Sequence, residues 1–178
     1  GMLGFRLTGP GVAEQCNDGE VVRLQPDVRL VLGMLAEMNL PPIETMGAQG
    51  ARDFLTEFNK GRPAGRPVGE VGTGMLQGAD GPLPYKLYRP ATAGPHPIVV
   101  YFHGGGWVIG DLDTHEVVCQ KLAHEGELIV ISVDYRLAPE HRFPAAVDDA
   151  VTATRWVAAN AGDLGIDAAR LTVGGDSA

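Results

Sequence analysis

Hydrophobic positions in the first part of the chain recur at the spacing of amphipathic α-helices. The first stripe lies between Pro26-Asp27 and Pro41-Pro42 and consists of Val28, Val31, Leu32, Leu35 and Met38. A second stripe predicts a helix over residues 47–60. Residues 1–25 mix glycine, proline, asparagine and charged residues without a period, so we expect a loose arm there. Residues 1–65 are therefore predicted to form an arm and a helical appendage.

Beyond this region the pattern changes to short apolar runs that are typical of β-strands. Weak strand signals over 68–90, with a turn at Asp80-Gly81-Pro82, predict an antiparallel hairpin. Buried strands are expected at 98–102, 128–133 and 171–173, and helices from a capping box at Asp113-Thr114-His115-Glu116 to Gly126 and over 144–161. Strands that alternate with helices in this way predict an α/β fold with a parallel, right-handed βαβαβ arrangement.

Composition and charge narrow the classes of function. The chain has 178 residues, of which 44% are hydrophobic and 20% are charged, as in an ordinary globular protein. A formal net charge of −8, without a cluster of Lys or Arg, argues against nucleic acid as a partner, and no apolar run is long enough for an integral membrane segment. Cys16 and Cys119 have no metal-binding spacing and suit buried thiols in a reducing compartment. We expect a cytoplasmic protein with no metal and no organic cofactor.

A glycine-rich loop follows the apolar run 98–102 and has the sequence His103-Gly104-Gly105-Gly106-Trp107. Open α/β sheets bind ligands at the carboxyl ends of their strands, where bare N–H groups could hold an oxyanion. The alternative is that the glycines only make a tight turn. Two nucleotide-binding motifs are excluded, because Ile109 replaces the third glycine of a dinucleotide loop and Asp111-Leu112 replace the Lys and Ser/Thr of a P-loop.

A second candidate is Ser177, in the sequence Gly175-Asp176-Ser177-Ala178 at the end of the run 171–173. This tetrapeptide matches the first positions of a G-x-S-x-G nucleophile elbow, although alone it is usually just a turn. The glycine loop after an earlier buried strand makes the pair much stronger. We expect the oxyanion donors and the nucleophile to lie at the same edge of one sheet.

Several motifs, in their order and spacing, carry a family resemblance. They are His103–Trp107, Asp134-Tyr135-Arg136-Leu137-Ala138-Pro139-Glu140-His141, Phe143-Pro144-Ala145-Ala146 followed by Asp148-Asp149, and Gly175–Ala178. With them the chain, from about Pro26 to Ala178, resembles the hormone-sensitive-lipase family (family IV) of α/β-hydrolase esterases. The resemblance implies an α/β-hydrolase fold with a mostly parallel central sheet. It also implies that residues 1–65 form an arm and a helical cap, and that residues 66–178 form an incomplete core.

The same resemblance implies the roles of the site residues. Ser177 would be the catalytic nucleophile, and the N–H groups of Gly105, Gly106 and Ala178 would form the oxyanion hole. His103 and Gly104 belong to the oxyanion-loop motif, in which the histidine holds the loop and does not act as the base. Neither a metal nor a cofactor is implied.

One departure from the family concerns the rest of the catalytic triad. In this fold the acid and the histidine follow the serine, whereas this sequence ends at Ala178. We interpret the other histidines and the aspartates as structural: His96, His115, His124, His141, Asp134, Asp148, Asp149 and Asp176. We therefore expect the chain to be the first part of a longer enzyme and to be inactive alone.

The predicted activity is hydrolysis of short- to medium-chain acyl esters by a serine carboxylesterase, with a small-molecule ester as substrate. One alternative is a protein that binds a small ligand without turnover, as plant hormone receptors of this family do. Another is an arylacetamide-type amide hydrolase. The sequence leaves a homo-oligomer open.

Overall fold

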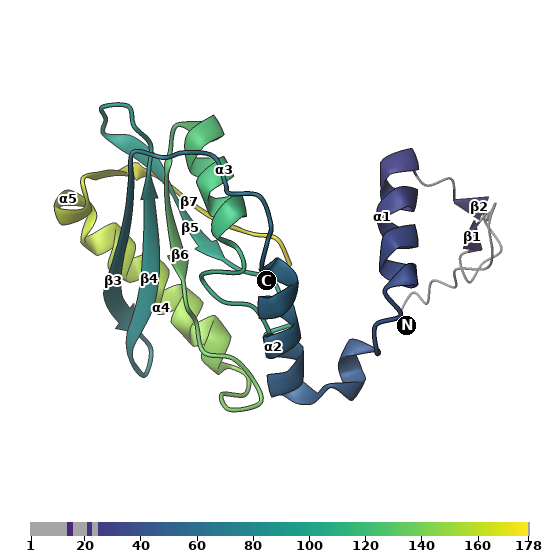
Figure 1. Cartoon of the computed structure of the whole chain (residues 1–178). Coiled ribbons are helices and arrows are strands. Elements are labelled where there is room, and N and C mark those ends of the chain that lie inside the picture. Colours follow the sequence, from purple (N-terminus) through teal and green to yellow (C-terminus); the bar gives the residue numbers. More distant parts are fainter. Residues whose placement is uncertain (1–13, 16–20, 23–24, 178) are drawn as a thin grey trace. The chain divides into compact units, whose positions relative to one another are not determined.

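The computed structural model describes residues 14–15, 21–22 and 25–177 (Figure 1). The chain divides into two compact units, residues 1–45 and 46–178. In the first unit, β1 (Glu14–Gln15) pairs antiparallel with β2 (Val21–Val22), and α1 (Pro26–Glu37) and a 3-10 helix (Ile43–Thr45) follow. The helix predicted to begin at Pro26 is confirmed, and most of the expected loose arm falls outside the described residues.

The second unit opens with a helix and an antiparallel hairpin, both as predicted. The helix is α2 (Gly47–Asn59), and the hairpin consists of β3 (Glu70–Gly78) and β4 (Gly81–Arg89). Proline and glycine residues between α2 and β3 prevent either element from extending. Helix α2 and the sheet belong to this one unit.

A parallel part completes the sheet. Its elements are β5 (His96–Phe102), α3 (Glu116–Gly126), β6 (Ile129–Val133), α4 (Ala145–Ala159), α5 (Ala161–Leu164) and β7 (Ile166–Gly175). The strand order is β3-β4-β6-β5-β7, in which β5 pairs in parallel with both β6 and β7, while β4 is antiparallel to β6. The predicted βαβαβ arrangement is present, within a sheet that the hairpin makes mixed.

Apolar side chains from the two faces of the sheet form two core layers. Helix α3 covers one face, where Cys119 and Ala123 pack with Tyr88 and Val130. Helix α4 covers the other, where Ala153 and Val157 pack with residues of β5 and β6 (Figure 1). Burial raises the pKa of the Cys119 thiol to about 12, so this cysteine is a buried structural thiol as expected; Cys16 lies outside the described residues.

Two local expectations are wrong. The carboxylate of Asp111 accepts the N–H groups of Asp113 (2.9 Å) and Thr114 (2.7 Å), so Asp113 does not cap α3, which begins at Glu116 without a side-chain cap. The Asp111 carboxylate, which comes two residues before Asp113, already accepts the backbone N–H groups of this turn. Strand β7 is not buried: it pairs only with β5 in the described sheet, and Val173 is 55% exposed.

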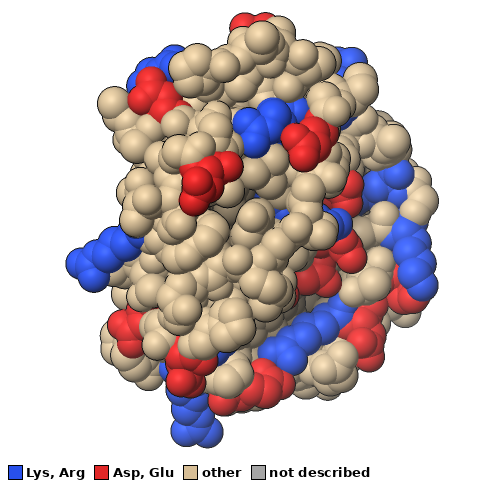
Figure 2. Space-filling model, turned by 90° about the vertical axis from the view of Figure 1, so that its left-hand side faces the viewer, with Lys and Arg blue, Asp and Glu red and all other residues tan. Residues whose placement is uncertain are grey.

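Charged side chains of both signs are interspersed over the face of the molecule that Figure 2 shows. Lys and Arg form no broad patch on that face, which therefore offers no basic surface of the kind that binds nucleic acid. Within the part of the chain that the structure describes, no helix has both the length and the apolar character needed to cross a membrane.

Candidate active site

The glycine loop and Ser177 leave the sheet from neighbouring parallel strands. Phe102, the last residue of β5, is in register with Gly175, the last residue of β7. A Cβ added at Gly104 would lie only 3.0 Å from the Cβ of Ser177. The two motifs, found far apart in the sequence, therefore meet at one sheet edge. Ala178, predicted as the third oxyanion donor, lies outside the described residues.

Asp176 ties these two segments together. Its Oδ1 atom accepts hydrogen bonds from the Gly104 N–H group (2.7 Å) and the Tyr101 hydroxyl (2.9 Å). The His115 Nε2 atom lies 3.2 Å from Oδ2. Burial raises the pKa of Asp176, but the hydrogen bonds from Tyr101 and Gly104 outweigh this effect, so the pKa lies below its ordinary value. The ionised carboxylate thus holds the serine turn against the glycine loop.

His103 is fully buried beneath the loop. Its Nδ1–H group donates to the carbonyl of Gly104 (2.9 Å), and its own carbonyl accepts the Tyr135 hydroxyl (2.5 Å). The ring stacks between Tyr135, at a centroid distance of 4.5 Å, and His115, at 5.3 Å. Burial lowers the pKa of His103, which keeps the ring neutral at pH 7. These contacts fit a histidine that supports the loop.

The other described histidines bond to groups away from the serine. His96 lies within hydrogen-bond distance of the carbonyls of Glu127 and Thr92, and His124 of the Pro67 carbonyl. His141 is exposed in the loop after β6. Among the described residues, no histidine hydrogen-bonds the Ser177 hydroxyl. Such a serine is an ordinary, unactivated alcohol.

The backbone of the loop has a shape that requires glycine. Gly105 has a φ of +131° and Gly106 a φ of +59°. A Cβ at Gly105 would lie 2.0 Å from the carbonyl oxygen of Ile109, whereas a Cβ at Gly106 would meet nothing within 4 Å. The N–H groups of Val108 and Ile109 donate to the Gly105 carbonyl, each at 3.1 Å, and close the turn. The chain can thus approach a ligand closely here.

We expect Gly105→Ala to destabilise the protein more than Gly106→Ala, because only the first adds a collision with backbone to an unfavourable φ. Gly106→Ala should cost about 1–2 kcal/mol, the ordinary penalty of a left-handed residue. The free energies of unfolding in urea check this. Equal losses for the two variants would mean that the turn relaxes freely around a side chain.

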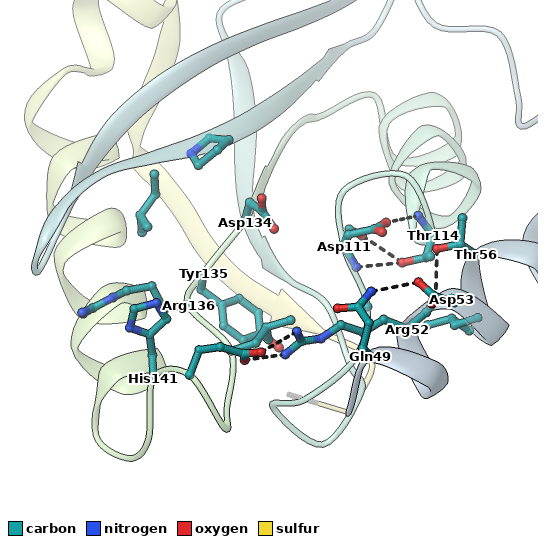
Figure 3. Close-up of a pocket in the computed structure, with 16 residues that line it drawn as sticks. Gln49, Arg52, Asp53, Thr56, Asp111, Thr114, Asp134, Tyr135, Arg136 and His141 are labelled. Atoms are coloured by element: carbon teal, nitrogen blue, oxygen red, sulfur yellow. Dashed lines mark hydrogen bonds and ion pairs between the residues drawn. The ribbon is translucent and has the colours of Figure 1, made fainter. Parts of the chain in front are cut away.

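Cavities flank the glycine loop. An apolar cavity of about 330 Å³ is lined by Gly106, Trp107, Phe143 and Val147, among others, and Trp107 also lines a second apolar cavity of about 280 Å³ beside α4. A polar cavity of about 600 Å³ lies between α2 and the loops that follow β5 and β6 (Figure 3). Apolar cavities thus adjoin the glycine loop, whereas charged side chains line the cavity beside α2.

Comparisons with known proteins agree with the fold. A family model described as alpha/beta hydrolase fold matches residues 99–178. A solved structure of an ester hydrolase from the metagenome of Lake Arreo, complexed with a derivative of bipyridine phosphonate, is similar with a TM-score of 0.82 and 39% identity. The similarity covers 87% of this chain and 51% of that one. The chain has the α/β-hydrolase fold.

Relatives of this α/β-hydrolase chain are named as esterases. It is 36% identical over 155 residues to an arylesterase of Saccharolobus solfataricus, covering 87% of the chain and 51% of that protein. It is 51% identical over 106 residues to Esterase LipI of Mycobacterium tuberculosis, covering 58% of the chain and 33% of that protein. The chain therefore spans about a third to a half of the length of these relatives. The predicted resemblance to α/β-hydrolase esterases is confirmed.

The sequence identified Ser177, His103 and the glycines, but it missed the polar contacts around them. The sequence alone predicts only a structural role for Asp176, and it associates neither Tyr101 nor His115 with it. Those partners come from β5 and from the turn before α3. The register of β5 against β7 places Tyr101 beside Gly174, next to the serine turn, and no local pattern records that register.

Proposed function

We propose that the protein is a serine carboxylesterase of the hormone-sensitive-lipase family, acting on short- to medium-chain acyl esters. The observation that carries this proposal is the juxtaposition of Ser177 with the glycine loop at the ends of β7 and β5. The esterase names of the relatives support the reaction class. In this proposal, residues 1–65 are the arm and cap and residues 66–178 belong to the catalytic core of a cytoplasmic enzyme.

The chemistry follows from the proposed roles. The Ser177 oxygen attacks the ester carbonyl carbon as its proton passes to the base of the triad, and the carbonyl electrons move onto the carbonyl oxygen. The carbonyl then re-forms, the C–O bond to the alcohol portion breaks, and the alcohol leaves with that proton to give an acyl-enzyme. The N–H groups of Gly105, Gly106 and Ala178 would stabilise the oxyanion. Loss of one such donor raises a barrier by roughly 3–4 kcal/mol. Water then releases the carboxylic acid and restores the serine.

In this proposal, the acyl group lies in the apolar cavities beside the loop. The two apolar cavities that Trp107 lines adjoin Gly106 and the amino-terminal part of α4, and their volumes suit small ligands.

In this fold the acid and base of the triad follow the serine. The proposal therefore concerns the protein at the length of its relatives, of which this chain spans a third to a half.

Amide hydrolysis is the second candidate, and one relative favours it. The chain is 42% identical over 99 residues to Arylacetamide deacetylase-like 3 of Homo sapiens, which covers 54% of the chain and 24% of that protein. The same serine and oxyanion donors would serve either acyl substrate. Rates on an aryl ester and the matching aryl amide separate the two activities.

A serine-directed phosphonate tests the proposal directly. The complete protein is incubated with the phosphonate, and intact mass and peptide mapping then locate the adduct. We expect one adduct, on Ser177, because only an activated serine reacts quickly. A protein that stays unlabelled while binding a small ester without turnover would contradict the esterase proposal and favour the binding alternative.

A further inference from the structure

Arg52 reaches from helix α2 into the structure that surrounds the glycine loop. Its Nε–H group donates to the carbonyl of Val108 at 2.7 Å, and its Nη2 donates to the carbonyl of Ala138 at 2.9 Å. Its Nη1 and Nη2 groups also bond the two carboxylate oxygens of Glu140, at 2.9 and 2.8 Å. Figure 3 shows this side chain crossing one end of the polar cavity. One guanidinium thus joins α2 to two separate loops.

Both of these carbonyls belong to segments that fix the glycine loop. Val108 donates its N–H group to the Gly105 carbonyl at 3.1 Å. Ala138 donates its N–H group to the Trp107 carbonyl at 2.7 Å. Arg52 therefore holds the turn after Gly105-Gly106 in two ways. It bonds the carbonyl of Val108 within the turn directly, and it bonds Ala138, whose N–H group in turn holds the carbonyl of Trp107. A shift of the guanidinium would move the peptides that carry the predicted oxyanion donors.

The ion pair with Glu140 orients the guanidinium. The hydrogen bond from Arg52 lowers the pKa of Glu140 to about 2, so this carboxylate stays ionised through neutral and mildly acidic pH. The Glu140 side chain is 53% exposed and that of Arg52 is 22% exposed, and ion pairs at such exposure add little stability. Its bidentate geometry, however, fixes the plane of the guanidinium and hence the direction of the other N–H groups.

We propose that Arg52 is a positioning residue for the reaction, setting the oxyanion loop through the carbonyls of Val108 and Ala138 while Glu140 orients it. The proposal rests on the proposed esterase function. Lysine at this position keeps the charge but has no planar fork, so it cannot hold both carbonyls and the carboxylate together. We expect Arg52→Lys to lower kcat about tenfold with KM nearly unchanged, since misplaced oxyanion donors weaken transition-state binding more than substrate binding.

A charge-swapped pair distinguishes positioning from a simple ion pair. Arg52→Glu combined with Glu140→Arg restores opposite charges, but the glutamate cannot donate to the Val108 carbonyl. We expect kcat of the double variant to stay low. Recovery to the wild-type value would overturn the proposal, because it would mean that any ion pair between these positions suffices.

The matched control is Arg89→Lys. Arg89 also bonds one carboxylate, that of Glu70 at 3.2 Å, and one carbonyl, that of Leu164 at 2.8 Å. It lies at the end of β4 that is remote from the glycine loop, because β4 runs antiparallel to β6. We expect its kcat to remain within about twofold of the wild type. An equal loss in both lysine variants would overturn a specific role for Arg52.

Amide hydrogen exchange of residues 104–110 tests the same proposal without any substrate. In the complete protein, Arg52→Lys should speed exchange in this segment, whereas Arg89→Lys should not. Unchanged exchange in Arg52→Lys would overturn the positioning role even if ester hydrolysis were found. Conversely, a wild-type protein without ester hydrolysis or phosphonate labelling would refute the esterase proposal, while faster exchange would still support the contact.

Discussion

Replacing Ser177 with alanine should lower kcat/KM for an aryl ester by about 10⁴–10⁶-fold in the complete protein. The reason is that the acyl-enzyme needs an oxygen at this position, next to Gly104 and the glycine loop. Water attack in the remaining site would leave only a small residual rate. The measurement is a steady-state assay of ester hydrolysis on purified wild type and variant, with thermal unfolding as a check on the fold.

Ser132 provides the matched control, because it is the other serine of the chain. Ser132 is fully buried on β6, and its hydroxyl oxygen has no hydrogen-bond partner among the described residues. Ser132→Ala should therefore retain activity within about twofold. Unchanged turnover in Ser177→Ala would refute the nucleophile and, with it, the serine mechanism.

The sequence predicted the order of the elements well because each one has a strong local signal. Apolar runs marked β5 and β6, and helical spacing marked α1, α2 and α4. The α/β class and the convergence of the two motifs then followed from the rule that parallel strands share a carboxyl edge. The same reasoning failed for the start of α3, where the carboxylates of Asp111 and Asp113 competed for one turn.

Long-range polar contacts could not be predicted in this way. Arg52 lies on the polar side of an ordinary amphipathic helix, and its partners are 56 and 88 positions away, at Val108 and Glu140. An exposed-face arginine and a contact-forming arginine look alike in a helical pattern. The apolar run 171–173, for its part, does not record how many neighbouring strands pair with β7.

Asp149 is the other residue whose removal should have a large effect. It lies on α4 with no exposed surface, yet it carries a carboxylate. Its Oδ1 atom accepts the Ala79 N–H group (3.0 Å) and Nη2 of Arg136 (2.9 Å), and Oδ2 accepts the backbone N–H (3.1 Å) and Nε–H (2.8 Å) of Arg136. One buried carboxylate therefore joins α4, the β3–β4 turn and the loop after β6.

We expect Asp149→Ala to lower the free energy of unfolding by about 3–5 kcal/mol, because it leaves the guanidinium of Arg136 and the Ala79 N–H group without their buried partner. Urea unfolding at pH 7 measures this loss. The control is Asp148→Ala, whose side chain is exposed in the first turn of the same helix and should cost less than about 1 kcal/mol. Similar losses in the two variants would contradict a buried anchor.

The dependence of this loss on pH gives a second test of Asp149. Burial raises its pKa, but the hydrogen bonds from Arg136 and Ala79 outweigh that effect and leave the pKa below its ordinary value of 3.8. A depressed pKa gives stability that is complete above 3.8 and is lost as the pH falls through the folded-state pKa. The difference between wild type and Asp149→Ala should therefore be constant at neutral pH and shrink below about pH 4. If the difference in the free energy of unfolding grew in acid, the folded state would favour the protonated form of Asp149, which would contradict the lowered pKa.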